Sequence, residues 1–239
     1  MANLIPDQLL AAGNELCAAL RPLRFSLPVT HIYNPLEYAR RPHEAFIRKF
    51  AGGKKRVLFL GMNPGPFGMA QTGVPFGEIA AVRDWMGISE PVERPQREHP
   101  KRPVTGFACS RSEVSGRRLW GWAKETFGTA DAFFREHFAV NFCPLVWMSD
   151  SGSNITPDKL SAAELAPVTK ACNEHLKRVI AALEPDWLVG VGGFAEACFR
   201  QVAPDRRIAR IPHPSPANPA ANKDWSGAAM KSLREAGVL

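Results

Sequence analysis

The chain has 239 residues, of which 45% are hydrophobic and 22% are charged, and its formal net charge at pH 7 is +7. This length can bury a substantial core, and the composition excludes wholesale disorder. We expect one domain over residues 1–239. The positive charge fits a polyanionic partner such as a nucleic acid, although many basic proteins bind no such partner.

Hydropathy and cysteine spacing exclude several further classes. No uncharged apolar segment is long enough to span a membrane, and the N-terminus lacks the features of a signal peptide. The five cysteines are widely spaced without a C-x-x-C pair, which argues against a zinc ribbon or an iron–sulfur cluster. We therefore expect reduced thiols, no metal or other cofactor, and no membrane contact. We expect the protein to be cytoplasmic. In a bacterium it would associate with the nucleoid, and in a eukaryote it would be nuclear.

The first part of the chain alternates between helical and extended patterns. Leucines recur at helical spacing over residues 7–20, and Pro22 ends that helix. An extended segment over 30–35 precedes a predicted helix over 36–50, which a glycine pair terminates. These segments are interpreted as packing elements.

A long connection follows in the middle of the chain. A short predicted helix over 79–87 leads into a proline-rich stretch of mixed charge over 88–118. A loop of that length inside a compact domain is usually functional or disordered. Its arginines are equally compatible with DNA contacts and with a solvated surface.

Helices and strands then alternate to the end of the chain. We predict helices over 115–127, 130–136, 162–183, 194–202 and 222–236, and strands over 138–145, 187–192 and 208–211. With an apolar strand over 56–62, this order predicts an α/β three-layer sandwich with a central four-stranded parallel sheet. The run Gly190-Val191-Gly192-Gly193 lacks the spacing of a dinucleotide loop and favours a tight strand-to-helix turn.

The strand over 56–62 runs into a stretch rich in glycine and proline, GMNPGPFGMAQTGVPFGE, over 61–78. Pro64 favours an extended conformation at Asn63, and Gly65 permits close backbone approach. Ligands bind at the carboxyl ends of strands in open α/β sheets, so Asn63 is a candidate site residue. A tight turn with an Asx hydrogen bond is the structural alternative.

Two further polar residues are predicted at the same edge of the sheet. Asn141 interrupts the apolar strand over 138–145, and a buried amide needs a partner. His213 follows the strand over 208–211 between prolines that restrict its backbone. In a parallel sheet, both residues gather with Asn63. Taken singly, His213 could be a constrained turn residue and Asn141 a satisfied core amide.

The expected site contains no acid. The sequence shows no paired carboxylates, nucleophile elbow, phosphate-binding loop or convincing metal spacing among its histidines. An amide is too weak a base to deprotonate water, but it can orient a water by hydrogen bonds. That is sufficient when the electrophile is already cationic, as in cleavage of a glycosidic bond through an oxocarbenium-like state.

Three segments resemble the motifs of single-strand-selective monofunctional uracil-DNA glycosylases. They are the stretch over 61–78, NFCPL over 141–145, and HPSP over 213–216. The similarity runs from about Tyr33 to the C-terminus and implies the uracil-DNA glycosylase fold, in agreement with the predicted sheet. It implies an enzyme that flips uracil, and oxidised uracils such as 5-hydroxymethyluracil, out of DNA. Such an enzyme hydrolyses the N-glycosidic bond and leaves an abasic site without strand cleavage.

The resemblance also implies roles for individual residues. Asn63 would hold the attacking water at the sugar C1′, and His213 would donate to uracil O2 as a neutral imidazole. Asn141 would pair with the Watson–Crick edge of the base, since an amide can complement only one donor–acceptor pattern. Phe76 would stack on the flipped ring, although a single aromatic residue is more often part of a core.

Further residues are expected to line the pocket or to contact DNA. The backbones of Met62 and Gly65 would line the base pocket. DNA contacts are expected at Pro66, Ser151, Gly152, Ser153, Ser215, Pro216, Ala217 and Asn218. We expect a monomer whose partner is uracil-containing DNA, both single- and double-stranded.

One position departs from the family pattern. Glycosylases of this type often present a long side chain just after the HPSP sequence, which fills the gap left by the flipped base. This chain has Ala217 at that position. A methyl group fills little of the gap, so activity on stable duplex is expected to be weaker than on single strands.

Two alternative functions are considered. A mismatch-specific uracil/thymine glycosylase shares the Asn-Pro-Gly sequence but reads the opposite base, and Asn141 together with His213 disfavours it. A non-catalytic binder of single-stranded or damaged DNA would keep the pocket. Such a binder would associate with DNA without forming an abasic product.

Overall fold

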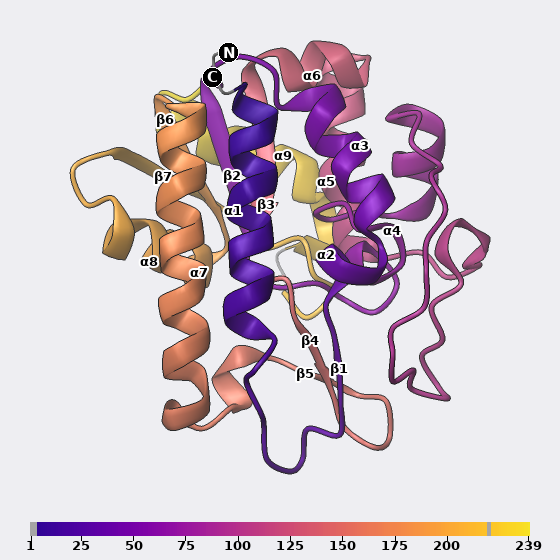
Figure 1. Ribbon diagram of the computed structural model, residues 1–239. Coiled ribbons are helices and arrows are strands. Elements are labelled where there is room, and N and C mark those ends of the chain that lie inside the picture. The colour runs from indigo at the N-terminus through magenta and orange to yellow at the C-terminus, as the bar shows by residue number, and fades with distance from the viewer. Residues whose placement is uncertain (1–3, 219–220) are drawn as a thin grey trace.

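Helices enclose a central sheet in the computed structural model, which describes residues 4–218 and 221–239 (Figure 1). The strands of this sheet are β2 (Val57–Gly61), β3 (His137–Asn141), β6 (Trp187–Val191) and β7 (Arg207–Ile211). They are hydrogen-bonded in the order β3-β2-β6-β7, and every neighbouring pair is parallel. The predicted α/β fold with a four-stranded parallel sheet is confirmed.

Helices form the layers on both faces of the sheet. Their bounds are α1 Ile5–Leu20, α2 Pro35–Tyr38, α3 Arg40–Phe50, α4 Met69–Thr72, α5 Val114–Phe127, α6 Ala130–Glu136, α7 Ala162–Leu183, α8 Gly193–Val202 and α9 Ala221–Glu235. Figure 1 shows α1 and α7 side by side in front of the sheet and α9 behind it. No helix within the described residues is long and apolar enough to cross a membrane.

Strand β2 lies inside the sheet, and all of its residues are buried. Because helices cover both faces, a strand in this position needs apolar side chains on both sides. This requirement explains the continuous apolar run that predicted the strand. In the register of the sheet, Gly61 at the carboxyl end of β2 lies opposite Asn141, the last residue of β3.

An aromatic cluster fixes α5 to the sheet. Trp120 and Trp122 of α5 lie 5.8 Å and 6.3 Å from Phe133 of α6, measured between ring centroids. Phe59 of β2 reaches the same cluster at 6.2 Å from Phe133, and Trp122 contacts Trp225 of α9 at 6.5 Å. Edge-to-face and stacked aromatic pairs of this kind add to the favourable burial of apolar surface. The position of α5 relative to β2 is therefore well determined.

The structure also contains a second, smaller sheet that the sequence did not predict. It contains β1 (His31–Tyr33), β4 (Val146–Met148) and β5 (Asn154–Ile155), paired antiparallel in the order β1-β4-β5. Its strands are too short to show a periodic pattern. The predicted strand over 138–145 is wrong at its carboxyl end, because Pro144 has no N–H for the ladder and the chain turns toward β4.

The predicted helix over 36–50 consists of two helices, α2 and α3, with a break at Ala39. This residue has φ −101° and ψ 33°, outside helical geometry. In one continuous helix, Pro42 would lack the N–H that bonds the carbonyl of Tyr38, and its ring would clash with that carbonyl. The short helix predicted over 79–87 also differs from the structure, where residues Ala81–Trp85 form a π-helical turn.

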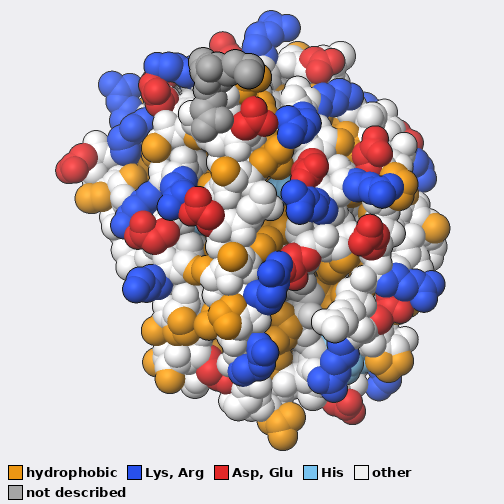
Figure 2. Space-filling view, in the orientation of Figure 1, with side chains coloured by type: hydrophobic (Ala, Val, Ile, Leu, Met, Phe, Trp, Pro, Cys, Tyr) orange, Lys and Arg blue, Asp and Glu red, His pale blue; other side chains and the backbone are white. Residues whose placement is uncertain are grey.

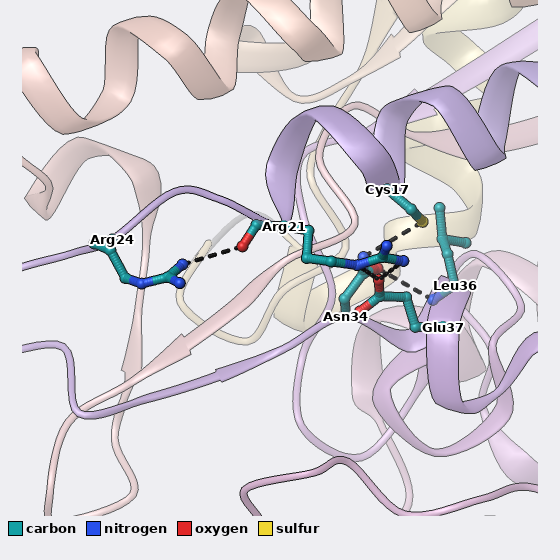
Figure 3. A network of polar contacts seen from close by, with 6 residues as sticks. All are labelled: Cys17, Arg21, Arg24, Asn34, Leu36 and Glu37. Atoms are coloured by element: carbon teal, nitrogen blue, oxygen red, sulfur yellow. Dashed lines mark hydrogen bonds and ion pairs between the residues drawn. The ribbon is translucent and has the colours of Figure 1, made fainter.

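Polar contacts join the end of α1 to the start of α2 (Figure 3). Arg21 donates to Glu37 Oε1 at 2.8 Å in an exposed ion pair. Asn34 caps α2 by accepting the Leu36 N–H at 3.2 Å, and its amide donates to Cys17 Sγ at 3.4 Å. Exposed ion pairs contribute little to stability. The helix cap is therefore the more important part of this junction.

The long connection between α4 and α5 is ordered by hydrogen bonds from other segments. Tyr33 Oη accepts the His99 N–H at 2.7 Å and donates to the carbonyl of Arg102 at 2.8 Å. Gln71 bonds to backbone groups of the same connection through both atoms of its amide. The connection therefore packs on β1 and α4 and forms part of the fold.

Helix α5 approaches the first motif closely, and a substitution at Gly116 tests this contact. A Cβ on Gly116 would lie 2.1 Å from the carbonyl oxygen of Phe76. We predict that Gly116→Ala lowers the free energy of unfolding by about 1–3 kcal/mol, the usual cost of overpacking. Urea denaturation measures the change.

Gly121→Ala in the same helix is the matched control. No atom lies within 4 Å of a Cβ added at Gly121. The control should be neutral or should gain up to about 1 kcal/mol from helix propensity. Equal free energies of unfolding for the two variants would contradict the close packing of α5 on the motif.

Candidate active site

A cavity of about 240 Å³ lies at the carboxyl ends of β2, β3 and β7. The predicted site residues that line it are Met62, Asn63, Gly65, Pro66, Phe76, Asn141, His213 and Ser215. They come from three segments that are far apart in the sequence. The parallel sheet therefore brings these residues together at one edge, as its topology predicts.

Asn63 lies just beyond the end of β2, and a backbone group fixes its amide. The Nδ2 atom donates to the carbonyl of Leu145 at 3.3 Å. This bond connects the segments that follow β2 and β3, so Asn63 does more than close a local Asx turn. With Nδ2 occupied, Oδ1 is the acceptor that remains for a ligand in the cavity.

Asn141 lies against Gly61, its partner across the sheet. A Cβ on Gly61 would lie 2.4 Å from Asn141 Oδ1 and 2.5 Å from the ring of Phe76, so glycine is required there. The Nδ2 atom of Asn141 donates to Met69 Sδ at 3.2 Å. Sulfur is a weak acceptor that a ligand carbonyl can replace. The amide therefore presents its oxygen toward Gly61 and its nitrogen toward Met69.

Phe76 has a left-handed backbone conformation with φ 53°, which is uncommon for a bulky residue. Its carbonyl accepts the Nε1–H of Trp120 at 2.9 Å. Strained conformations cluster at ligand sites, where the surrounding structure holds them in place. The side chain of Phe76 lines the cavity rather than filling the core alone.

His213 is held as a neutral imidazole. The Ser215 N–H donates to Nδ1 at 3.1 Å, so the ring proton is on Nε2. Burial lowers the pKa of His213, which also favours the neutral form. Gly192, with φ 89°, leaves space for this ring in the turn between β6 and α8. That turn is the tight strand-to-helix connection predicted from the sequence.

Residues of α5 and α9 support the segment that carries this histidine. Arg118 of α5 donates to the carbonyl of Pro214 at 2.8 Å and to Asn222 Oδ1 at 3.0 Å. Trp225 of α9 donates to the carbonyl of Pro212 at 2.8 Å. The sequence left Arg118 undecided between a DNA contact and a solvated surface. In the structure it positions the proline-rich segment.

Several residues with predicted DNA contacts do not line the cavity. They are Ser151, Gly152, Ser153, Pro216, Ala217 and Asn218. Ala217 is exposed, and Asn218 donates to the carbonyl of His213 at 3.1 Å, so both lie beside the cavity. The loop over 149–153 leads into Asn154, which lines the cavity. The DNA contacts predicted for Ser151, Gly152 and Ser153 stay predictions.

Glu113 lines the cavity although the sequence did not assign it to the site. A Cβ on Gly65 or Gly68 would lie 2.6 Å or 2.4 Å from its Oε2 atom, so the carboxyl group packs on both glycines. Oε2 is buried, and the Gly68 N–H is directed at the carboxyl group. Burial raises the pKa of Glu113 to about 7, with a further increase from Glu78 and an opposing effect of the Gly68 N–H.

The expectation of a site without an acid is therefore wrong. Glu113 precedes α5 and reaches the cavity because that helix packs on the first motif. Its place in a stretch of mixed charge hid it from sequence analysis. The only sign of Glu113 in the sequence is the pair Gly65 and Gly68, because these glycines leave room for a side chain from another segment. Other unassigned residues that line the cavity are Pro64, Met69, Ser115, Asn154 and Thr156.

Comparison with protein families shows to which family the chain belongs. The family described as the uracil DNA glycosylase superfamily matches residues 48–234. The chain belongs to the uracil-DNA glycosylase superfamily. The matched region contains all the cavity-lining residues described above, and the prediction of a DNA glycosylase is confirmed.

This glycosylase is similar to mammalian proteins named single-strand selective monofunctional uracil DNA glycosylase. The Bos taurus protein is 47% identical, with 92% of this chain and 82% of the relative covered. The Mus musculus protein is 46% identical, with 94% of this chain and 82% of the relative covered. The Rattus norvegicus protein is 47% identical, with 100% of this chain and 87% of the relative covered. The crystal structure of Pedobacter heparinus SMUG2 has a TM-score of 0.63 at 18% identity over 94% of both chains, which supports the fold alone.

The glycosylase should lose stability as Glu113 ionises. The folded protein keeps this proton up to about pH 7, whereas the ordinary pKa of the group is 4.5. Between these values the folded state binds more protons than the unfolded state, so stability falls as pH rises. We predict that Glu113→Gln gains about 1–3 kcal/mol relative to wild type between about pH 5 and about pH 8. Urea denaturation at both pH values measures this, and a constant difference would contradict the burial of the carboxyl group.

Proposed function

We propose that this glycosylase flips uracil out of DNA and hydrolyses its N-glycosidic bond, leaving an abasic site without cutting the strand. The observation that carries the proposal is the orientation of Asn63 and His213, each fixed by a backbone group at the same cavity. The names of the mammalian relatives support the same activity. Flipping is required because the bond is inaccessible inside a duplex.

Asn63 positions the attacking water. Because its Nδ2 is bound to Leu145, its Oδ1 accepts a hydrogen bond from a water beside C1′ of the flipped nucleotide. The amide does not take a proton. The glycosidic bond breaks through an oxocarbenium-like state, which a neutral water can attack. Holding the water in place removes much of the entropic barrier to this step.

His213 assists the departure of the base. Negative charge builds on uracil O2 as the bond breaks, and the Nε2–H of His213 donates to that oxygen. Ser215 keeps Nδ1 as an acceptor and so keeps the donor at Nε2. A donor of this type, aimed at charge that develops in the transition state, supplies about 10²- to 10³-fold in rate.

Asn141 and Phe76 select the base. With Nδ2 toward Met69 and Oδ1 toward Gly61, Asn141 offers a donor to uracil O4 and an acceptor to its N3–H. Cytosine presents the opposite pattern, so the fixed amide rejects it. Phe76 stacks on the ring. Oxidised uracils such as 5-hydroxymethyluracil keep the same edge, and we include them among the substrates.

A basic groove beside the site supports DNA binding. Its volume is about 470 Å³, and its lining includes Leu145, whose carbonyl accepts the hydrogen bond from Asn63. Its lining includes Arg21, Arg24, Arg94 and Arg97 and two acidic residues, Glu37 and Glu93, so basic residues outnumber acidic ones there. Figure 3 shows the first two of these on the segment after α1. Arginines in a groove attract the phosphates of a flanking strand, and the resulting affinity depends on salt.

The helical face formed by α1 and α7 has a different character. Figure 2 shows Lys and Arg side chains interspersed with Asp and Glu over this face. Mixed charges of this kind attract a polyanion less than a groove lined by arginines. The edge of the sheet that contains the cavity is therefore the proposed DNA-binding surface.

Asn63→Ala tests the proposed function. We predict a loss of about 10²-fold or more in the single-turnover rate, because the amide positions the water. Binding to uracil-containing DNA should persist, because the amide does not hold the base. Abasic sites are revealed by alkali after incubation with single- and double-stranded uracil oligonucleotides. Asn14→Ala, at an exposed position of α1 that does not line the cavity, is the control and should stay near the wild-type rate.

Each alternative function gives a different result in this assay. Binding by the wild type without abasic product on any substrate would identify a non-catalytic binder. Product from mismatched duplex alone would identify the mismatch-specific alternative. Near-native turnover by Asn63→Ala would remove Asn63 from the mechanism.

Ala217 is exposed next to Ser215 and leaves the gap behind a flipped base unfilled. Opening a duplex costs a few kcal/mol, less for mismatched or single-stranded bases. We predict that Ala217→Arg raises the rate on U·A duplex several-fold, with a smaller increase on U·G and the smallest on single strands. Single-turnover cleavage of the three substrates measures this. Equal changes on all three would show that Ala217 does not face the vacated stack.

A further inference from the structure

The segment from Asn63 to Met69 forms one wall of the base pocket. At its start, Asn63 marks the position of the sugar, and at its end, Met69 accepts the Asn141 Nδ2–H at 3.2 Å. In the proposed orientation of uracil, that Nδ2 binds O4, which is adjacent to C5. The wall between Asn63 and Met69 therefore faces the C5–C6 edge of the base.

The carboxyl group of Glu113 occupies the middle of this wall. Gly65 and Gly68 lie within it, and a Cβ on either would come within 2.6 Å of Glu113 Oε2. The two glycines therefore admit a carboxyl group where their own side chains would otherwise stand. The side chain lines the cavity, and the Gly68 N–H is directed at its carboxyl group. A carboxyl group has more hydrogen-bonding capacity than one N–H fills, so it can also bond a ligand that enters the cavity.

We propose that Glu113 is a specificity-determining residue that forms the C5 wall of the base pocket and hydrogen-bonds to a hydroxyl group on the C5 substituent. The inference rests on the proposed function, because Asn63 and Asn141 define the orientation of the base. A protonated carboxyl can both donate and accept, so it satisfies a hydroxyl in either orientation. An apolar wall of the same size would leave that hydroxyl unpaired and would disfavour the substituted base.

The position of Glu113 distinguishes this role from that of a general base. Its carboxyl group packs on Gly65 and Gly68, whereas the amide of Asn63 is anchored by the carbonyl of Leu145, in the segment that follows β3. Glu113 therefore acts on the choice of base, and no covalent step is assigned to it.

The test compares substituents of equal size that differ in one hydroxyl group. Single-stranded oligonucleotides carry uracil, 5-hydroxymethyluracil or 5-ethyluracil, and single-turnover rates are measured for wild type, Glu113→Leu and Glu113→Gln. Leucine keeps the approximate size of the side chain without a polar atom, whereas glutamine keeps a donor and an acceptor. The quantity of interest is the ratio of the rates on 5-hydroxymethyluracil and 5-ethyluracil.

We expect Glu113→Leu to lower this ratio by about 10-fold, the effect of one hydrogen bond. Glu113→Gln should keep the ratio within about 3-fold of wild type, since its amide also donates and accepts. A merely structural role would lower both rates together and leave the ratio unchanged. If Glu113→Leu does not fold, Glu113→Met provides the same comparison with a more adaptable side chain.

Three results would overturn the inference. An unchanged ratio in Glu113→Leu would show that the carboxyl group only supports the shape of the wall. An equal loss in Glu113→Gln would show that hydrogen bonding is not the cause. A wild type that cleaves uracil but not 5-hydroxymethyluracil would refute this role while leaving uracil hydrolysis intact. Absence of cleavage on uracil itself would instead contradict the proposed function.

Discussion

The candidate site depends on the close approach that Gly61 allows at the carboxyl end of β2. Because Gly61 has no Cβ, the amide of Asn141 and the ring of Phe76 occupy the space where a side chain would stand. The parallel register places Asn141 opposite this glycine, and Trp120 holds Phe76 from the other side. Asn63 follows in the same segment. The buried sheet thus determines where the cavity forms and which polar groups face it.

Burial shifts the two titratable side chains of the cavity, His213 and Glu113, toward their neutral forms. It lowers the pKa of His213 and raises that of Glu113 to about 7, so each is biased toward its neutral state. The other polar groups include the amides of Asn63 and Asn141. In such a site, the main new charge during reaction is on the departing base. Interactions that strengthen only then contribute directly to the rate.

The sequence predicted those features that a local pattern encodes. Long helices such as α1 and α7 were visible from their periodicity, and Asn63, Asn141 and His213 were visible as polar residues at the ends of apolar strands. The small antiparallel sheet was not visible, because its strands are too short for a pattern. Glu113 and Arg118 were missed because their roles depend on how α5 packs against distant segments. Such tertiary contacts leave little trace in a single sequence.

The protonation state of His213 provides the most direct test of the proposed mechanism. Nitrogen-15 NMR of the histidine rings, in complex with uracil-containing DNA bound to Asn63→Ala, distinguishes the two neutral tautomers and the imidazolium. His213→Ala in the same background assigns the signal. Because Ser215 donates to Nδ1 and burial lowers the pKa of His213, we predict a proton on Nε2 alone at about pH 7 and above. An imidazolium, or a proton on Nδ1, would contradict the assignment of His213 as a neutral donor to the departing base.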